Sequence, residues 1–210
     1  SYLAEWNVTY LFAGKASNVA AQAGLTERQG FRLYQASILL LLIAAVFLLR
    51  LSPFTLVPVL VTPQAWYVFS YMNGDALPLA AASLAAGIAL TRKSPLRSYL
   101  LGERHAERVV IVHALLFALC LGLLVISKRN YWPVAVFIAT TLASAGLRLP
   151  VRSSLAMAIV CTSGILWAAA GHALHQAYGL GWLLAVLSAT SVMILAYDGW
   201  RLVRSRMLAP

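Results

Sequence analysis

Residues 33–49 carry the sequence LYQASILLLLIAAVFLL, and this stretch decides the fold class. Beyond its first few residues it contains only Leu, Ile, Ala, Val and Phe, and it ends at Arg50, just before Ser52-Pro53. A helix of about 17 residues is about 26 Å long. That length suits a thin bilayer, or one whose surface is reached by the flexible side chains of Arg32 and Arg50. The stretch therefore predicts a membrane-spanning helix.

The composition of the whole chain agrees with this prediction. The 210 residues are 61% hydrophobic and 10% charged, with a mean hydropathy of +0.81. Soluble domains carry about a quarter charged residues, so a soluble domain, a disordered chain and a coiled coil are excluded. Cys120 and Cys161 lie inside apolar runs and indicate neither a disulfide scaffold nor a metal site. The first thirty residues lack a basic start followed by an apolar block, so we expect no signal peptide.

The net charge of +10 does not predict a nucleic-acid partner. Nucleic-acid surfaces gather basic residues on one solvated face, whereas the Lys and Arg residues here flank apolar segments. This arrangement is typical of membrane proteins, whose cytoplasmic loops are enriched in Lys and Arg. We therefore expect the lipid bilayer as a partner, and no nucleic acid.

Charged residues, Gly and Pro divide the chain into seven apolar segments after an amphipathic, interfacial segment at 1–30. We expect spanning helices at 33–49, 54–72, 76–90, 109–127, 133–147, 154–173 and 180–197. The second of these contains Pro58 and Pro63, which favour a kinked span; a re-entrant segment is the alternative.

The expected architecture is an all-α integral membrane protein with seven transmembrane helices in two three-helix bundles. The third and seventh spans align at an offset of about 105 residues, which favours an internal repeat. The organisation is a first bundle at 31–91, a basic cytoplasmic loop at 92–108, a linker helix at 109–127, a second bundle at 128–201 and a basic cytoplasmic tail at 202–210.

The distribution of basic residues predicts the orientation. With seven spans, eleven Lys and Arg residues fall on one side, including Arg50, Arg97 and Arg108, and five fall on the other, including Arg28. The side with more Lys and Arg is normally cytoplasmic. We expect a bacterial inner-membrane protein with its amino terminus outside and its carboxyl terminus in the cytoplasm.

The second half of the chain resembles a known family. Its features are a Pro-opened span containing Thr140, Thr141 and Ser144, a turn bearing Arg148 and Arg152, a span centred on Trp167, and a last span running into Gly199-Trp200-Arg201. In these it resembles the YgjV-type bacterial inner-membrane proteins, and more distantly the PnuC-type riboside transporters and the SWEET or PQ-loop carriers. The resemblance implies two three-helix bundles joined by a linker helix, and it implies no particular reaction.

Hydroxyl groups within the spans are the candidate contacts for a transported solute. We expect a site at the bundle interface, near the membrane midplane, formed by Ser83, Thr140, Ser144, Trp167 and Ser188. Thr162 and other intramembrane hydroxyls are further candidates, although each of them can instead bond to its own helix. The sequence thus favours a carrier of a small neutral solute; the alternative is a non-catalytic subunit or scaffold that packs against other membrane proteins.

We expect neither a catalytic site nor a bound cofactor. Haem ligation between His113 and either His172 or His175 would need side chains at one depth, and these lie at opposite membrane edges in the seven-span topology. Gly74-Asp75-Ala76-Leu77 is similar to an acidic motif of lysoplasmalogenase-like membrane hydrolases, which makes a lipid-acting hydrolase a further alternative. The acidic residues that border spans are Asp75 and Asp198, and they fall on opposite sides of the membrane. A site for acid–base or metal chemistry needs two or three convergent groups, so we expect no enzyme, no metal site and no cofactor.

Overall fold

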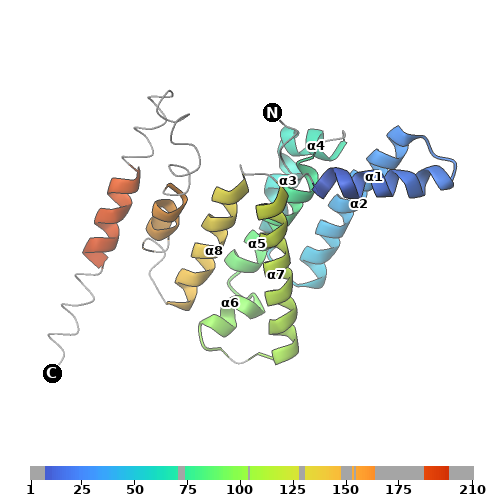
Figure 1. Ribbon diagram of the computed structural model, residues 1–210. Helices are drawn as coiled ribbons and strands as arrows, with labels where there is room; N and C mark the ends of the chain where they lie inside the picture. The colour runs from blue at the N-terminus through green and yellow to red at the C-terminus, as the bar shows by residue number, and fades with distance from the viewer. Residues whose placement is uncertain are drawn as a thin grey trace, which may run out of the picture. The chain divides into compact units, whose positions relative to one another are not determined.

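A computed structural model describes residues 8–70, 74–103, 105–127, 131–147, 153, 155–163 and 187–198. All regular elements in these ranges are helices (Figure 1). The chain forms two compact units, Ser1–Ala135 and Val136–Pro210. The all-helical prediction is confirmed for the described part of the chain.

The decisive apolar stretch lies in α2, Glu27–Leu48, which has 22 residues. At 1.5 Å per residue this helix is about 33 Å long, enough to cross the hydrocarbon layer. It begins six residues before the predicted start because Thr26 and Gln29 form a capping box. In this box the Thr26 amide donates to Gln29 Oε1 over 2.9 Å, and the Gln29 amide donates to Thr26 Oγ1 over 3.4 Å. The thin-membrane interpretation is therefore not needed.

The end of α2 is closed by backbone hydrogen bonds around Arg50. The Arg50 amide donates to the Phe47 carbonyl over 3.1 Å, and the Leu51 amide donates to the Val46 carbonyl over 2.9 Å. These two bonds define a Schellman motif, in which the residue at the Arg50 position is usually glycine. Arg50 has φ 53° and so adopts the left-handed conformation. The buried side chains of Val46 and Leu51 flank this turn.

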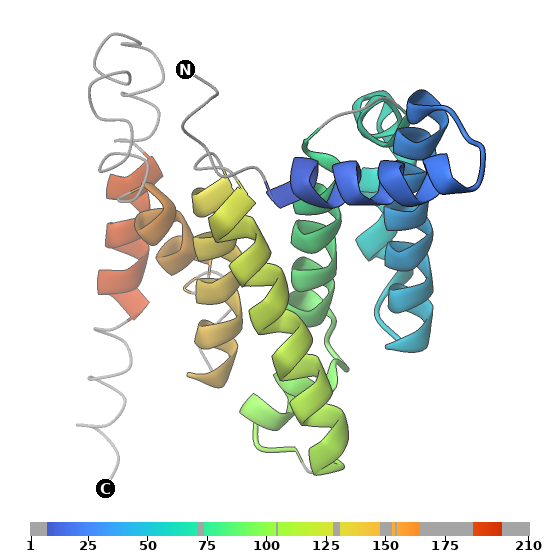
Figure 2. The same cartoon turned by 45° about the vertical axis from the view of Figure 1, so that its right-hand side comes forward.

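The second apolar segment is broken into three short helices rather than forming one kinked span. They are η2 at Pro53–Leu56, α3 at Val57–Val61 and α4 at Pro63–Ser70. The break at Thr62 precedes Pro63, which has no amide hydrogen to continue α3. Side chains satisfy the freed carbonyls: Thr62 Oγ1 donates to Pro58 O over 2.6 Å, and Trp66 Nε1 donates to Leu60 O over 2.7 Å. The segment leads from the lower end of α2 back to the upper end of α5 (Figures 1 and 2).

The central helix of the first unit is α5, Ala76–Leu90, whose bounds match the predicted third span. Its buried residues are mostly Ala, with Gly87 near its end. A Cβ atom at Gly87 would lie 2.7 Å from Thr55 Cγ2, so the absence of a side chain lets η2 approach α5 closely. α5 packs against α2 and α7, and small side chains make such close packing possible.

The predicted basic loop contains a short helix. This is α6, Pro95–Leu100, which leads by a short turn into α7, Glu107–Ser127. α7 runs antiparallel to α5 and packs along it (Figure 2). The predicted linker helix at 109–127 therefore exists, but within the described residues it forms part of the first unit rather than a separate linker.

Two described helices have the length and apolar composition of a membrane span, namely α2 and α7. The shorter apolar helices are Ala76–Leu90, Trp132–Gly146 (α8) and Leu187–Asp198. The predicted spans at 154–173 and 180–197 lie partly outside the described residues. Two spanning helices are therefore supported, whereas the seven-span topology remains a prediction.

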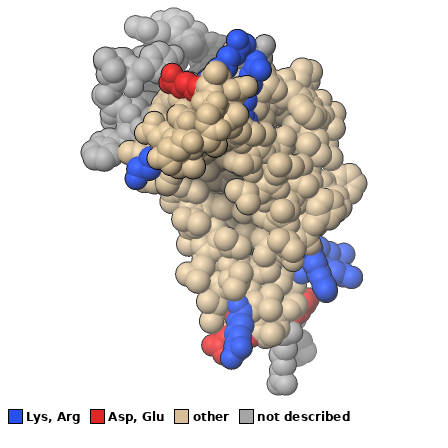
Figure 3. Space-filling view, turned by 90° about the vertical axis from the view of Figure 1, so that its right-hand side faces the viewer, with Lys and Arg blue, Asp and Glu red and all other residues tan. Residues whose placement is uncertain are grey.

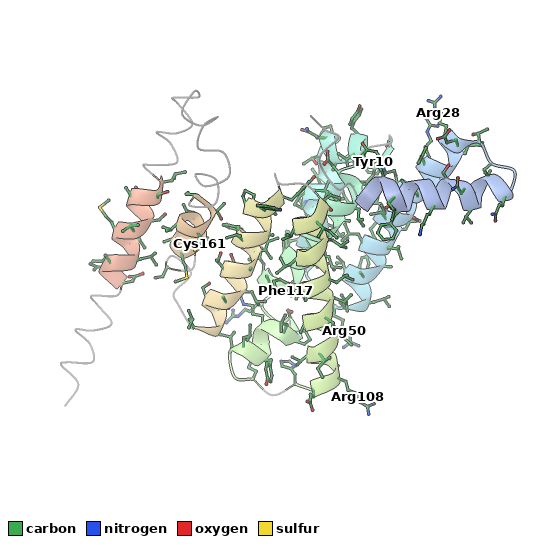
Figure 4. All side chains as sticks on the ribbon, in the orientation of Figure 1. Tyr10, Arg28, Arg50, Arg108, Phe117 and Cys161 are labelled. Carbon is green, nitrogen blue, oxygen red and sulfur yellow. The ribbon has the colours of Figure 1, made fainter. Side chains whose placement is uncertain are left out.

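Charged residues occupy the ends of the first unit. On the face in Figure 3, Lys, Arg, Asp and Glu gather at the two ends, with an uncharged surface between them. Figure 4 places Arg28 at the upper end and Arg50 and Arg108 at the lower end. An uncharged band between charged ends is the pattern expected of helices that cross a bilayer.

The second unit contains the rest of α8 and two further helical stretches, 155–163 and Leu187–Asp198. Ser153 Oγ donates a hydrogen bond to Asp198 Oδ2. This contact joins the start of the first stretch to the end of the second. Asp198 thus has a hydrogen-bond partner within the second unit.

Candidate functional site

The five predicted solute-binding residues fall in different parts of the chain. Ser83 lies on α5 in the first unit, whereas Thr140 and Ser144 on α8 and Ser188 on the last helical stretch belong to the second. Trp167 lies outside the described residues. The second unit is therefore the part of the chain in which a site can be examined.

The α8 hydroxyl groups donate hydrogen bonds within their own helix. Thr140 Oγ1 donates to Val136 O over 2.7 Å, and Ser144 Oγ donates to Thr141 O over 2.9 Å. A hydroxyl has one proton to donate, so neither residue keeps a donor for a solute. The sequence had left this local bonding open as the alternative, and the structure supports it for Thr140 and Ser144.

Two other hydroxyl groups of the second unit differ from those of Thr140 and Ser144 in their hydrogen bonding. Thr162 Oγ1 and Ser188 Oγ are buried and have no hydrogen-bond partner among the described residues. Buried polar atoms are nearly always hydrogen-bonded, and an unpaired one costs about 1–3 kcal/mol. Ser188 belongs to the predicted set, and Thr162 was a further candidate. Among the described residues, these two hydroxyls thus keep the donor that Thr140 and Ser144 use within their own helix.

Thr162 and Ser188 lie at similar distances along their helices from the Ser153–Asp198 hydrogen bond. The Ser153–Asp198 hydrogen bond fixes the meeting ends of their helices. Thr162 is nine residues from Ser153, and Ser188 is ten residues from Asp198, which correspond to about 14 and 15 Å along the helices. The two hydroxyls therefore lie at similar heights along these two helical stretches.

A second polar cluster lies at the lower end of the first unit. Arg97 Nη1 on α6 donates to Ala89 O over 3.2 Å and to Leu90 O over 3.1 Å. These are carbonyls of the last turn of α5, where the helix dipole places partial negative charge. Arg97 therefore caps α5, a role that the sequence analysis missed. The available signal was a basic residue on a short Pro-started helix soon after the end of an apolar one.

Of the three histidines considered as haem ligands, His113 lies among the described residues, and it is buried on α7. Its Nδ1 lies 2.8 Å from Val109 O, and because a carbonyl only accepts, Nδ1 carries the proton in this contact. Its Nε2 has no partner among the described residues. His172 and His175 lie outside them, so the haem hypothesis stays as the sequence left it.

Asp75, which the hydrolase alternative requires, contacts an aromatic residue. Tyr131 hydroxyl donates to Asp75 Oδ1 over 3.2 Å. Burial raises the pKa of the Tyr131 phenol, and the neighbouring Asp75 carboxylate raises it further. Tyr131 therefore stays protonated near neutral pH and links the start of α5 to the chain after α7. Within the described ranges, no three His, Cys, Asp or Glu side chains are grouped as metal ligation requires.

Comparison of the chain with protein-family models, curated proteins and solved structures gave no match. The resemblance to the YgjV-type proteins therefore remains a prediction from the residues of the second half. The function has to be argued from the chain itself.

Proposed function

We propose that this chain is a seven-span carrier of the bacterial inner membrane that moves a small, neutral, polar solute. The observation that carries this proposal is a pair of buried hydroxyls, Thr162 Oγ1 and Ser188 Oγ, that have no hydrogen-bond partner among the described residues. Hydroxyl groups both donate and accept hydrogen bonds and carry no charge. They suit a solute that has hydroxyl or amide groups and no net charge.

The interrupted second segment supports the same proposal. Carriers commonly contain discontinuous helices, which pack around a solute site near the midplane. Here α3 and α4 are separated at Thr62-Pro63, and the chain passes between α2 and α5 without one continuous helix. Such a segment can change its bend at a lower free-energy cost than a straight helix, because fewer backbone hydrogen bonds have to break.

The alternative, a non-catalytic subunit, is supported by α8. Thr140, Thr141 and Ser144 all donate to carbonyls of that helix, as hydroxyls do in helices that pack without a ligand. The carrier is preferred because Thr162 and Ser188 do not follow this pattern. The hydrolase alternative has no such supporting observation.

Transport by variants in reconstituted vesicles tests the carrier. We expect the purified protein to take up at least one of the radiolabelled neutral solutes glycerol, urea and ribose faster than protein-free vesicles. Thr162→Val and Ser188→Ala should each lower the uptake rate about fivefold, because each removes a hydrogen bond worth about 1 kcal/mol. Thr140→Val is the matched control and should retain uptake, since the Thr140 hydroxyl donates to its own helix.

Two outcomes would contradict the carrier. One is that none of the three solutes enters faster than through protein-free vesicles. The other is that Thr140→Val lowers uptake as much as Thr162→Val. Expression level and detergent-solubilised melting temperature of each variant distinguish lost transport from lost folding.

Labelling from each side of the membrane tests the orientation. In intact bacterial cells with a permeable outer membrane, a membrane-impermeant maleimide should label Arg28→Cys. It should label Arg108→Cys only after the inner membrane is opened. The native Cys120 is buried in α7 and provides the background measurement. Labelling of both variants from the same side would overturn the proposed topology.

A further inference from the structure

The amino-terminal helix α1, Val8–Gln22, runs across the direction of the spanning helices. In Figures 1 and 2 it lies crosswise to α2, with one end near the upper end of α7, at the end of the unit where Figure 4 places Arg28. It is held against α2 at Gly30: a Cβ atom there would lie 3.0 Å from Ser17 Cα and 3.1 Å from Ala20 Cβ. Gly30 is only three residues after Glu27, so α1 crosses α2 close to its charged start.

The α1 sequence carries three stripes at helical spacing. Small residues Ala13, Ser17 and Ala20 form the stripe that includes the contact with α2. Beside it, Phe12, Ala16 and Val19 form an apolar stripe, in which Phe12 is 46% and Val19 66% exposed. The stripe opposite the docked one consists of the exposed polar residues Lys15, Asn18 and Gln22, together with the exposed Leu11. Residues three, four and seven apart share one face of a helix.

We propose that α1 lies in the plane of the membrane surface and that the stripe Phe12, Ala16 and Val19 contacts lipid acyl chains. A helix with one apolar and one polar face, lying across the spanning helices near their charged ends, is what an interfacial helix requires. The close contact at Gly30 fixes the rotation of α1, so the apolar stripe has one direction relative to α2. The partner is the lipid surface itself.

The charge of α1 indicates which lipids are sufficient for its attachment to the membrane surface. Lys15 is its only charged residue, so electrostatic attraction to anionic headgroups contributes little. The apolar stripe therefore accounts for most of the attachment, and zwitterionic phosphatidylcholine is enough. This inference does not depend on transport, because it concerns only the position of α1.

Spin labels on the full-length protein test this placement. The background is Cys120→Ala with Cys161→Ala, reconstituted in phosphatidylcholine vesicles. Labels at Phe12→Cys and Val19→Cys should collide more often with oxygen, which concentrates in the acyl region, than with a water-soluble nickel complex, which stays in water. We expect their oxygen-to-nickel ratio to exceed that of Asn18→Cys and Gln22→Cys by about fivefold or more. Replacing half of the lipid by phosphatidylglycerol should leave the ratio unchanged.

Three results would overturn the inference. Equal access of the nickel complex to all four labels would place α1 in water. Shelter of Phe12→Cys and Val19→Cys from both reagents would show that protein covers the stripe, and cross-linking between chains would then identify a second copy. A dependence on phosphatidylglycerol would show that the surface recognises anionic headgroups instead. Circular dichroism of each labelled variant verifies that the helical content is unchanged.

Discussion

Gly87→Ala is expected to lower the free energy of unfolding by about 2 kcal/mol, because overpacking a tight helix contact typically costs about 1–3 kcal/mol. The new Cβ atom would lie 2.7 Å from Thr55 Cγ2, 2.9 Å from Thr55 Oγ1 and 3.2 Å from Leu51 Cδ1. Thr55 is short and branched at Cβ, so it cannot turn away as a long side chain would. The nearby bond from the Ser52 amide to Thr91 Oγ1, 3.1 Å long, further restrains this junction.

Gly122 provides the matched control for this prediction. It also lies in an apolar helix, α7, but a Cβ atom there would have nothing within 4 Å. Gly122→Ala should therefore be neutral or stabilising by up to about 1 kcal/mol, the helix propensity difference. Unfolding is followed by circular dichroism as sodium dodecyl sulfate displaces the native detergent. Thr55→Ala removes both clashing atoms, so it should rescue Gly87→Ala; if Gly87→Ala is as stable as Gly122→Ala, the close packing of η2 on α5 is wrong.

Arg97→Met is the second large expected effect, a loss of about 3 kcal/mol of stability. The two bonds from Arg97 Nη1 to the Ala89 and Leu90 carbonyls involve a charged donor. Hydrogen bonds to charged groups contribute about 1.5–3 kcal/mol, and the positive charge near a helix carboxyl end adds up to about 1 kcal/mol. Methionine keeps most of the side-chain volume, so packing changes little and the lost cap dominates.

Two further variants separate charge from hydrogen-bond geometry at this position. Arg97→Lys keeps the charge but has no planar guanidinium, so it should lose about half as much stability as Arg97→Met. Arg92→Met removes an exposed arginine from the same connection and should change stability by less than about 0.5 kcal/mol. The same detergent titration measures all three. Equal effects of Arg97→Met and Arg92→Met would show that the contacts at the end of α5 do not stabilise it.

Hydropathy was sufficient to predict the long helices of the first unit. The apolar runs at 76–90 and 109–127 correspond to α5 and α7, because burial or lipid contact of such runs outweighs local preferences. The predicted span starts six residues later than α2 because residues up to 30 are assigned to the interfacial segment, although Thr26 and Gln29 start the helix. Their spacing is that of a capping box, so this error was avoidable.

The candidate site was less predictable for a physical reason. Ser and Thr residues in apolar segments look alike in sequence, yet Thr140 donates to Val136 and Thr162 has no described partner. Whether a hydroxyl bonds to the preceding turn depends on its rotamer and on the space around it. Neither can be read from hydropathy. The break at Thr62 was foreseeable from Pro63, whereas the capture of the Leu60 carbonyl by Trp66 depends on the three-dimensional path of the chain.

With α2 as a membrane span, Arg50 would set the height of this helix in the lipid. Its left-handed backbone conformation costs about 1–2 kcal/mol compared with glycine, whereas moving an arginine toward the bilayer centre costs about 3 kcal/mol on insertion scales. Sliding α2 inward is therefore more costly than keeping the bent turn. Any mismatch between this helix and a thinner or thicker bilayer would then be absorbed at the opposite end, where α2 begins at Glu27, by tilting or by adjustment of the surrounding lipid.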